Sequence, residues 1–418
     1  MLSDIELKAN GTVDDSSQYA RPTDPDNTGI QPSYGHNTEQ TNGFTNSDDT
    51  RVPTLKHRRH SVSSALSHHS SIQSAASLAS IDRPPSRTSA TAEYPLEKLP
   101  AAKIYHPLSP HVIALLMPAS IFGVLARLGI QALVGYEGKS AFPLAWVQAM
   151  GCFIMGFGVG IKDPLGQFYG PLYTAMTTGF CGSLTTFSGW QFDVFQSWLN
   201  VNEDHRDWFR DVVDGVTKTV FTLGLSLAAV QFGSRLAFLL RHHLPHRQIP
   251  PPPRTVRYTF TALGVLVYAA AYPAYFRLPA AFRHQATAAL LFSFPGTLTR
   301  YLLSLYLNPK LSLFPLGTFT ANMFGTALLA LFHVLQGIDS DPVSPNACAI
   351  LQGLADGYCG CLTTVSTFAV EILTLEEWKS WLYTVMSWVV AQLLLLVILG
   401  PSYWAGGVSE RLACTFVS

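Results

Sequence analysis

Residues 179–190, GFCGSLTTFSGW, and residues 357–368, GYCGCLTTVSTF, are two copies of one segment, and this segment decides the fold. Each copy lies in the middle of a long apolar stretch, where its glycines and paired threonines favour a break in a helix. An acid follows three residues after each copy, at Asp193 and at Glu371. The segment therefore indicates a duplication and predicts a broken helix in each half.

The duplication extends on both sides of this segment, with the same order of motifs in each half. A Gly-x-Leu-x-Arg motif comes first, a Phe-Pro-Leu motif followed by an amide side chain comes second, and a hydroxyl side chain follows the broken stretch. The matched polar residues are Arg127 with Arg300, Gln148 with Asn322, and Thr222 with Ser387. Because the order is kept throughout, we interpret the two halves as internal repeats.

Composition places this duplication in a membrane protein. The chain has 418 residues with 27 basic and 27 acidic side chains, so its net charge gives no reason to expect nucleic acid as a partner. Of these 54 charges, 22 lie in residues 1–103, and the remainder of the chain is far poorer in charge than a soluble domain. Nine apolar stretches of spanning length follow, at about 111–134, 142–161, 172–199, 213–240, 256–276, 286–307, 315–335, 347–373 and 381–400.

These stretches predict an all-α polytopic membrane protein: two four-helix repeats joined by one linking helix, each with a broken third helix. A single connecting span inverts whatever follows it, so the two repeats have opposite orientations in the bilayer. We divide the chain into a tail (1–103), a first repeat (104–241), a basic hinge with the linking helix (242–283), a second repeat (284–402) and a C-terminal tail (403–418).

The basic hinge at 241–257, with four arginines and five prolines, is expected to face the cytoplasm. The N-terminus has no signal-peptide pattern, so the tail should be cytoplasmic and the C-terminus extracellular. The tail is rich in Ser, Thr, Asn, Asp and Pro and is predicted to be disordered. Within it, Ser61 follows a basic run and is a candidate kinase site; the alternative is a solvated run without a role in the main function. The six cysteines are interpreted as small buried hydrophobic residues rather than a disulfide framework.

Two kinds of ion site suit the repeated residues. Backbone carbonyls at two helix breaks related by a pseudo-twofold axis could share one cation, because backbone freed at membrane depth cannot face lipid; a plain helix kink is the alternative. The uncharged donors Gln148, Asn322, Thr222 and Ser387 suit a small anion, although an isolated polar residue in a span more often joins helices.

Two arginines at membrane depth, and the absence of carboxylate clusters and catalytic motifs, limit the classes of function that the sequence allows. Arg127 and Arg300 either attract anions in a vestibule or pair structurally, with Asp193 or Glu371 as candidate partners. No carboxylate cluster lies in mid-span, which argues against proton-coupled transport. The sequence also contains no phosphate-binding loop, metal-ligand spacing or nucleophile motif, so nothing predicts an enzyme.

With these motifs, the chain resembles the fluoride channels of the Fluc/CrcB type, and specifically the fused two-repeat fluoride exporters of eukaryotes (FEX). The resemblance covers about residues 111–400 and rests on the G-x-C-G-x-L-T-T-x-S signature, which occurs twice. It implies an antiparallel pair of four-helix units, a central structural Na⁺ and two narrow fluoride pores. Carried over by motif position, the Na⁺ would be held by the backbone carbonyls of Gly182, Thr185, Gly360 and Thr363.

The resemblance also implies pore residues, and here the two halves differ. The second-helix amide falls on Asn322 and, less well, on Gln148, and the fourth-helix hydroxyl falls on Ser387 and Thr222. The two pore phenylalanines fall on Phe187 and Trp190 in the first repeat and on Val365 and Phe368 in the second. In the family each pore takes its two rings from different units. One pore would then combine Phe187 with Phe368 and stay intact, while Trp190 with Val365 would leave a degenerate pore.

The function implied is passive export of cytoplasmic fluoride down its electrochemical gradient, by a monomer with an internal pseudo-dimer in the plasma membrane. Two alternatives remain open from the sequence. A coupled secondary anion transporter also uses inverted repeats with broken helices. A membrane receptor or scaffold would act through its Ser-rich tail, and would lose its function if residues 1–100 were deleted.

Overall fold

The structure, a computed structural model, describes residues 105–135, 142–200, 207–243, 250–311, 314–410 and 412–416. These residues are mainly helical, and the β-structure among them is limited to an isolated bridge between Ile338 and Val408. The predicted all-α class is confirmed. The N-terminal tail, with the candidate kinase site at Ser61, lies outside the described residues, as does the middle of the basic hinge.

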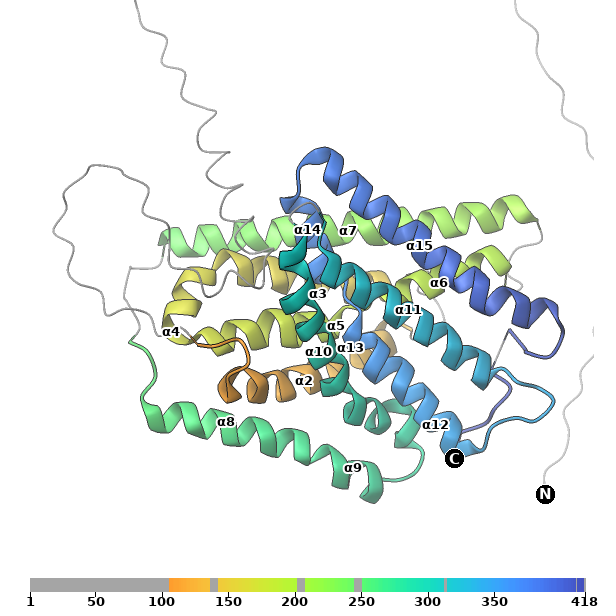
Figure 1. Cartoon of the computed structure of the whole chain (residues 1–418), viewed down its shortest axis with the longest axis horizontal. Helices are drawn as coiled ribbons and strands as arrows, with labels where there is room; N and C mark the ends of the chain where they lie inside the picture. Colours follow the sequence, from red (N-terminus) through yellow and green to blue (C-terminus); the bar gives the residue numbers. More distant parts are fainter. Residues whose placement is uncertain are drawn as a thin grey trace, which may run out of the picture. The chain divides into compact units, whose positions relative to one another are not determined.

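The first repeat contains the four predicted spans, and its third span is broken into pieces (Figure 1). The intact helices are α2 (Pro110–Val134), α3 (Pro143–Gly160) and α7 (Trp208–His243). The broken span consists of α4 (Lys162–Thr174), a π-helical turn (Ala175–Cys181), α5 (Gly182–Leu184) and α6 (Phe187–Leu199).

The linking helix and the second repeat follow in the same order. The linking span is α8 (Arg254–Ala269) with α9 (Ala271–Arg277). A π-helical turn (Arg283–Thr287) leads into α10 (Ala288–Leu307), which a 3₁₀ turn (Asn308–Lys310) ends, and α11 (Leu316–Gln336) follows. The second broken span is α12 (Pro345–Gly353), a π-helical turn (Leu354–Cys359), α13 (Gly360–Leu362) and α14 (Ser366–Thr374), and the last helix is α15 (Glu377–Trp404).

Local sequence signals fix several of the helix starts. The Ser109 side chain accepts a hydrogen bond from the Val112 backbone N–H at the start of α2, and Ser344 does the same for Ala347 at the start of α12. Proline occupies a first-turn position directly after each serine. Both residue types are favoured there because the first backbone N–H groups of a helix have no partner within it.

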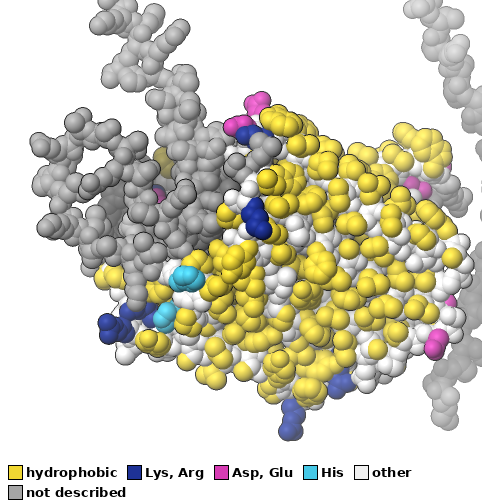
Figure 2. Space-filling view, in the orientation of Figure 1, with side chains coloured by type: hydrophobic (Ala, Val, Ile, Leu, Met, Phe, Trp, Pro, Cys, Tyr) yellow, Lys and Arg dark blue, Asp and Glu magenta, His cyan; other side chains and the backbone are white. Residues whose placement is uncertain are grey.

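The described surface suits a bilayer. Among the residues that the structure describes, six helical segments are long and apolar enough to cross one: α2, α3, α7, α8 together with α9, α11 and α15. The two broken spans are divided into pieces shorter than a crossing. Figure 2 shows a face covered by apolar side chains, with the few charged ones near its edges. Exposed large apolar residues of this kind match a lipid environment rather than water.

The cysteines correct one expectation. Cys152, Cys181, Cys359 and Cys361 are free and buried, as small apolar residues would be. Cys348 and Cys414, in contrast, form a disulfide, so the reading of all six as hydrophobic residues is wrong. The reason is that residues beyond α15 fold back, so that the Gln336 carbonyl at the end of α11 accepts hydrogen bonds from the backbone N–H groups of residues 413 and 414.

Candidate functional site

The two predicted breaks are present, and each is made by extended threonine backbone. Thr185 has φ −87° and ψ 148°, and the next residue, Thr186, has φ −139° and ψ 121°. Thr363 has φ −94° and ψ 153° in the second repeat. Extended residues cannot continue the helical hydrogen-bond ladder, so backbone groups are freed on both sides of each break. The short helices that precede the breaks, α5 and α13, contact each other.

Hydroxyl groups join the two breaks across the repeat interface. Thr185 Oγ1 lies 3.0 Å from Thr364 Oγ1 and accepts the backbone N–H of Ser366 at 3.1 Å. In the reverse direction, Thr363 Oγ1 lies 3.0 Å from Ser188 Oγ and accepts the backbone N–H of Ser188 at 3.1 Å. Each repeat therefore supplies the partner for backbone that the other repeat has freed, as burial at membrane depth requires.

Two amide side chains, which we name the amide clamps, form hydrogen bonds to the backbone at the two breaks. Gln148 Nε2 donates to the Thr186 carbonyl at 2.7 Å, and its Oε1 accepts the Thr186 N–H at 3.2 Å. Asn322 Nδ2 donates to the Thr364 carbonyl at 3.3 Å, and its Oδ1 accepts the Thr364 N–H at 2.9 Å. Glutamine and asparagine make the same pair of bonds, so the difference in length does not change the contact.

The two membrane-depth arginines bind backbone rather than acids. Both are 2% exposed. Their guanidinium groups donate to carbonyls around the breaks: Arg127 to Gly360 at 2.8 Å and to Asp356, and Arg300 to Cys361 and Thr178, each at 2.8 Å. The suggested pairing with Asp193 or Glu371 is therefore wrong, because the freed carbonyls satisfy the donors instead. A buried guanidinium needs such partners.

Glycine allows these guanidinium groups to approach. A Cβ atom on Gly182 would lie 2.4 Å from Arg300 Nη1, and a Cβ atom on Gly360 would lie 2.4 Å from Arg127 Nη1. These distances are well inside van der Waals contact, so a side chain at either position would displace the guanidinium group from the carbonyls that it binds.

The acids that follow the breaks have different partners in the two repeats. Asp193 lies 3.2 Å from Lys218 Nζ, which also lies 3.3 Å from an oxygen of Asp214. Glu371 is fully buried and accepts the hydroxyl of Thr318 at 2.6 Å and that of Tyr383 at 2.7 Å. Sequence reasoning did not select Lys218 or Tyr383. The repeat offset could have found them, because each lies four residues before the matched hydroxyl of its repeat.

The predicted pore aromatics meet in one buried cluster. The rings of Phe187 and Phe368 lie 5.3 Å apart in an edge-on arrangement with 73° between their planes, and we call them the aromatic pair. Phe368 also lies 5.0 Å from the ring of Tyr383, and Phe187 lies 5.6 Å from the ring of Trp190. Val365 belongs to the same core cluster. The Trp190 indole N–H donates to the backbone carbonyl of residue 218 at 3.3 Å.

The two matched hydroxyls differ in their surroundings. The Ser387 side chain is 1% exposed, and its Oγ atom is buried without a hydrogen-bond partner among the described residues. Ser387 lies four residues after Tyr383 on α15, so both side chains occupy the same helix face. Thr222 is 3% exposed, and its carbonyl accepts the Ser226 hydroxyl at 2.7 Å.

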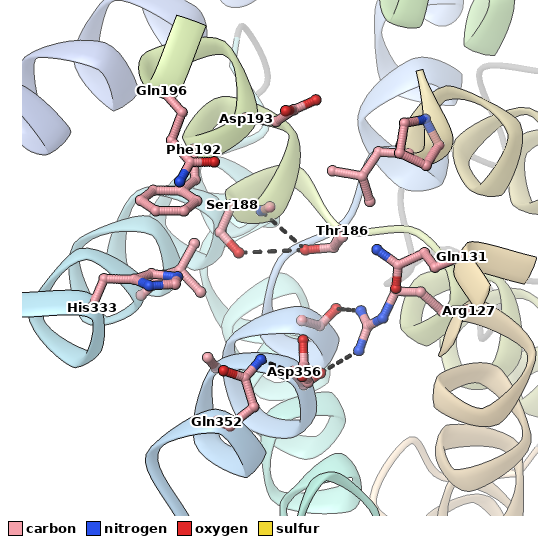
Figure 3. A pocket seen from close by; sticks show the side chains of 16 residues that line it. Arg127, Gln131, Thr186, Ser188, Phe192, Asp193, Gln196, His333, Gln352 and Asp356 are labelled. Carbon is pink, nitrogen blue, oxygen red and sulfur yellow. Dashed lines mark hydrogen bonds between the residues drawn. The ribbon is translucent and has the colours of Figure 1, made fainter. Parts of the chain in front are cut away.

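A polar pocket of about 300 Å³ opens beside the first break (Figure 3). Hydroxyl groups of Thr186 and Ser188 lie at its base, and Asp193 and Arg127 lie at its sides. The remaining lining residues come from α2, the start of α3, α6, α11 and the second broken span, with Gln131, Gln196, His333, Gln352 and Asp356 among them. The pocket therefore places a polar cavity next to one break.

Comparison with known proteins agrees with this arrangement. The CrcB-like protein family, described as Camphor Resistance (CrcB), matches residues 114–234 and 287–401, one segment in each repeat. The chain is 32% identical over 320 residues to Fluoride export protein 1 of Candida albicans, covering 71% of this chain and 81% of that protein. It is 30% identical over 305 residues to Fluoride export protein 1 of Schizosaccharomyces pombe, covering 70% and 96%.

A bacterial relative matches a shorter part. The Fluoride-specific ion channel FluC of Acinetobacter baumannii is 41% identical over 86 residues, which is 21% of this chain and 64% of that protein. No solved structure matches the chain significantly.

Proposed function

Since this chain belongs to the CrcB-like protein family, we propose that it is a fluoride-selective channel that lets cytoplasmic fluoride leave the cell passively. It is a transport protein of the membrane rather than an enzyme. The relatives named above are fluoride export proteins and a fluoride-specific channel.

One observation carries the proposal: Phe368 of the aromatic pair contacts Tyr383, and one turn further along α15 the buried Ser387 hydroxyl has no partner among the described residues. Aromatic edges are electropositive and attract an anion, whereas ring faces repel it. Tyr383 contacts Phe368 and shares a helix face with Ser387, whose Oγ is unpartnered among the described residues. A small anion could therefore exchange its water for ring edges and a hydroxyl donor.

We assign conduction to a single pathway, the one that contains the aromatic pair. Its rings come from different repeats, and its polar track includes Ser387 and Asn322. The related positions Trp190 and Val365 offer an indole and an aliphatic side chain, and only one of these can present a ring edge. Gln148 and Thr222 belong to that second track, which we propose does not conduct.

A structural Na⁺ between the breaks fits the donor set. The carbonyl oxygens of Thr185 and Thr363 belong to extended residues, and oxygen ligands suit such a cation. The Gly360 carbonyl accepts one bond from Arg127 and keeps a second lone pair, and Gly182 is its counterpart in the first repeat. Bound there, the ion would attract carbonyl oxygens of both repeats and so stabilise the contact between them. We expect replacement of K⁺ by Na⁺ to raise the melting temperature of the purified protein.

The proposed orientation puts the N-terminus and the basic hinge in the cytoplasm and the C-terminus outside, in the plasma membrane. Arg241, Arg254 and Arg257 support the first part through the excess of basic residues in cytoplasmic loops. The disulfide of Cys348 with Cys414 supports the second, because disulfides persist in oxidising compartments. An inside-negative potential then drives the anion outward.

The test is ion efflux from liposomes that contain the purified chain, followed with fluoride and chloride electrodes. We expect rapid fluoride efflux that requires valinomycin and K⁺ to carry compensating charge, with no chloride efflux. If fluoride efflux required the coupled movement of a second ion, the protein would be a transporter and not a channel. Deletion of residues 1–100 should leave the efflux unchanged, whereas a scaffold that acts through its tail would lose its function.

A further inference from the structure

Two glutamines, the buried Gln191 and the half-buried Gln392, are hydrogen-bonded where α6 meets α15, outside the motifs described above. Gln392 Nε2 donates to Gln191 Oε1 at 2.9 Å and to the Gln191 carbonyl at 3.0 Å. The indole N–H of Trp198 donates to Gln392 Oε1 at 3.1 Å. Gln191 is 0% exposed, and its Nε2 group has no partner among the described residues. The pair therefore keeps an amide donor that nothing in the described protein uses.

The two glutamines lie on the same two helices as Phe187 and Ser387, further along each helix. Gln191 lies four residues after Phe187 on α6, so the two side chains share a helix face one turn apart. On α15, Gln392 follows Ser387 by five residues, or about 7.5 Å of helix. The two helices lie side by side and run in the same direction (Figure 1). The glutamines thus lie beyond the aromatic pair, toward the ends of α6 and α15.

The second track has no such donor. By the repeat offsets, Ala369 corresponds to Gln191 and Leu227 corresponds to Gln392. Both of these residues pack in the core cluster that holds the aromatic rings. In the second track, the corresponding helices therefore pack without amide side chains. Packing alone does not explain why the other track has two glutamines at this level.

We propose that Gln191 and Gln392 form an anion subsite of the conducting pathway, in which the Gln191 amide N–H takes over the ion from the aromatic edges and Ser387. The ligand class is a small, strongly hydrated monovalent anion, which here is fluoride. Apolar side chains, among them Phe195 and Leu395, are clustered where α6 and α15 continue, and in such low-dielectric surroundings a hydrogen bond to the ion is electrostatically stronger than in water. The inference rests on the proposed function.

The test uses the full chain in liposomes, with fluoride efflux measured over a range of fluoride concentrations. The variants are Gln191→Met, which keeps the length but removes the donor, and the double change Gln191→Ala with Gln392→Leu, which copies the second track. We expect maximal efflux to fall about tenfold or more, and the half-saturating fluoride concentration to rise. The melting temperature should change little, because the second track packs with the same residues.

Gln336→Leu is the matched control. Gln336 is also 0% exposed and hydrogen-bonded, but it lies at the end of α11, near the disulfide, away from the aromatic pair. Its loss should lower the melting temperature and leave half-saturation unchanged. Wild-type half-saturation and maximal efflux in both Gln191 variants would overturn the subsite. Absence of fluoride efflux from the wild-type chain would instead overturn the proposed function.

Discussion

The first and second repeats hold their breaks with the same set of contacts but carry different side chains along the tracks beside them. In both repeats an amide clamps the threonine backbone and an arginine binds carbonyls. Beside the breaks, Lys218 pairs with Asp193 in one repeat, whereas Tyr383 binds Glu371 in the other. The fold needs both breaks, and we infer that conduction needs only one track, which leaves the other free to diverge.

The largest expected effects are losses of stability when the contacts that both repeats use to hold their breaks are disturbed. Gly182→Ala and Gly360→Ala each push a Cβ atom into a guanidinium that is already bound to carbonyls. We expect each change to lower the free energy of unfolding by about 3 kcal/mol, as overpacking in a tight core does. The measurement is the melting temperature in detergent, with Gly129→Ala, where a Cβ atom meets nothing within 4 Å, as control. A large loss for one glycine alone would show that the breaks are not equivalent.

Changes in the amide clamps should have a somewhat smaller effect, again equal in the two repeats. Gln148→Met and Asn322→Leu replace each amide by an apolar side chain of similar size, and they leave a buried N–H and C=O of the break without partners. We expect about 2 kcal/mol of destabilisation in each case. Denaturation of the two variants under identical conditions measures this. If only Asn322→Leu destabilised the protein, the Gln148 contacts would carry little energy and the first break would be held by other groups.

The smallest effect sharpens the difference between the tracks. Ser387→Ala removes the unpartnered hydroxyl beside the aromatic pair, whereas Thr222→Val removes its counterpart in the second track. We expect fluoride efflux per protein to fall about tenfold for the first variant, equivalent to about 1.4 kcal/mol, and to stay unchanged for the second. Equal losses would assign conduction to both tracks.

Much of this architecture could be predicted from the sequence, because apolar periodicity and repetition are properties of the chain itself. The nine spans lie close to the observed helices, and the glycines and threonines of residues 179–190 predicted the break at Thr185. The resemblance to the fluoride channels also implies that Phe187 pairs with Phe368, and these two rings lie 5.3 Å apart.

What the sequence missed depends on backbone and on long-range contacts. The sequence suggested either a role in attracting anions or an acid partner for Arg127, whereas the side chain binds carbonyls, which no pattern of side chains reveals. The disulfide was missed because Cys348 lies within an apolar span and Cys414 in a short tail, and no spacing rule links them. Gln191 and Gln392 are 201 residues apart, so only the packing of α6 on α15 brings them together.

The central claim, that one of two related tracks conducts, is tested most directly by fluoride efflux from liposomes that contain Phe187→Ile or Trp190→Ile. Both residues are buried aromatics of α6, and they lie one turn apart. The account predicts that Phe187→Ile reduces efflux to the leak of protein-free liposomes, while Trp190→Ile conducts like the wild type. Equal reduction by the two substitutions would contradict it.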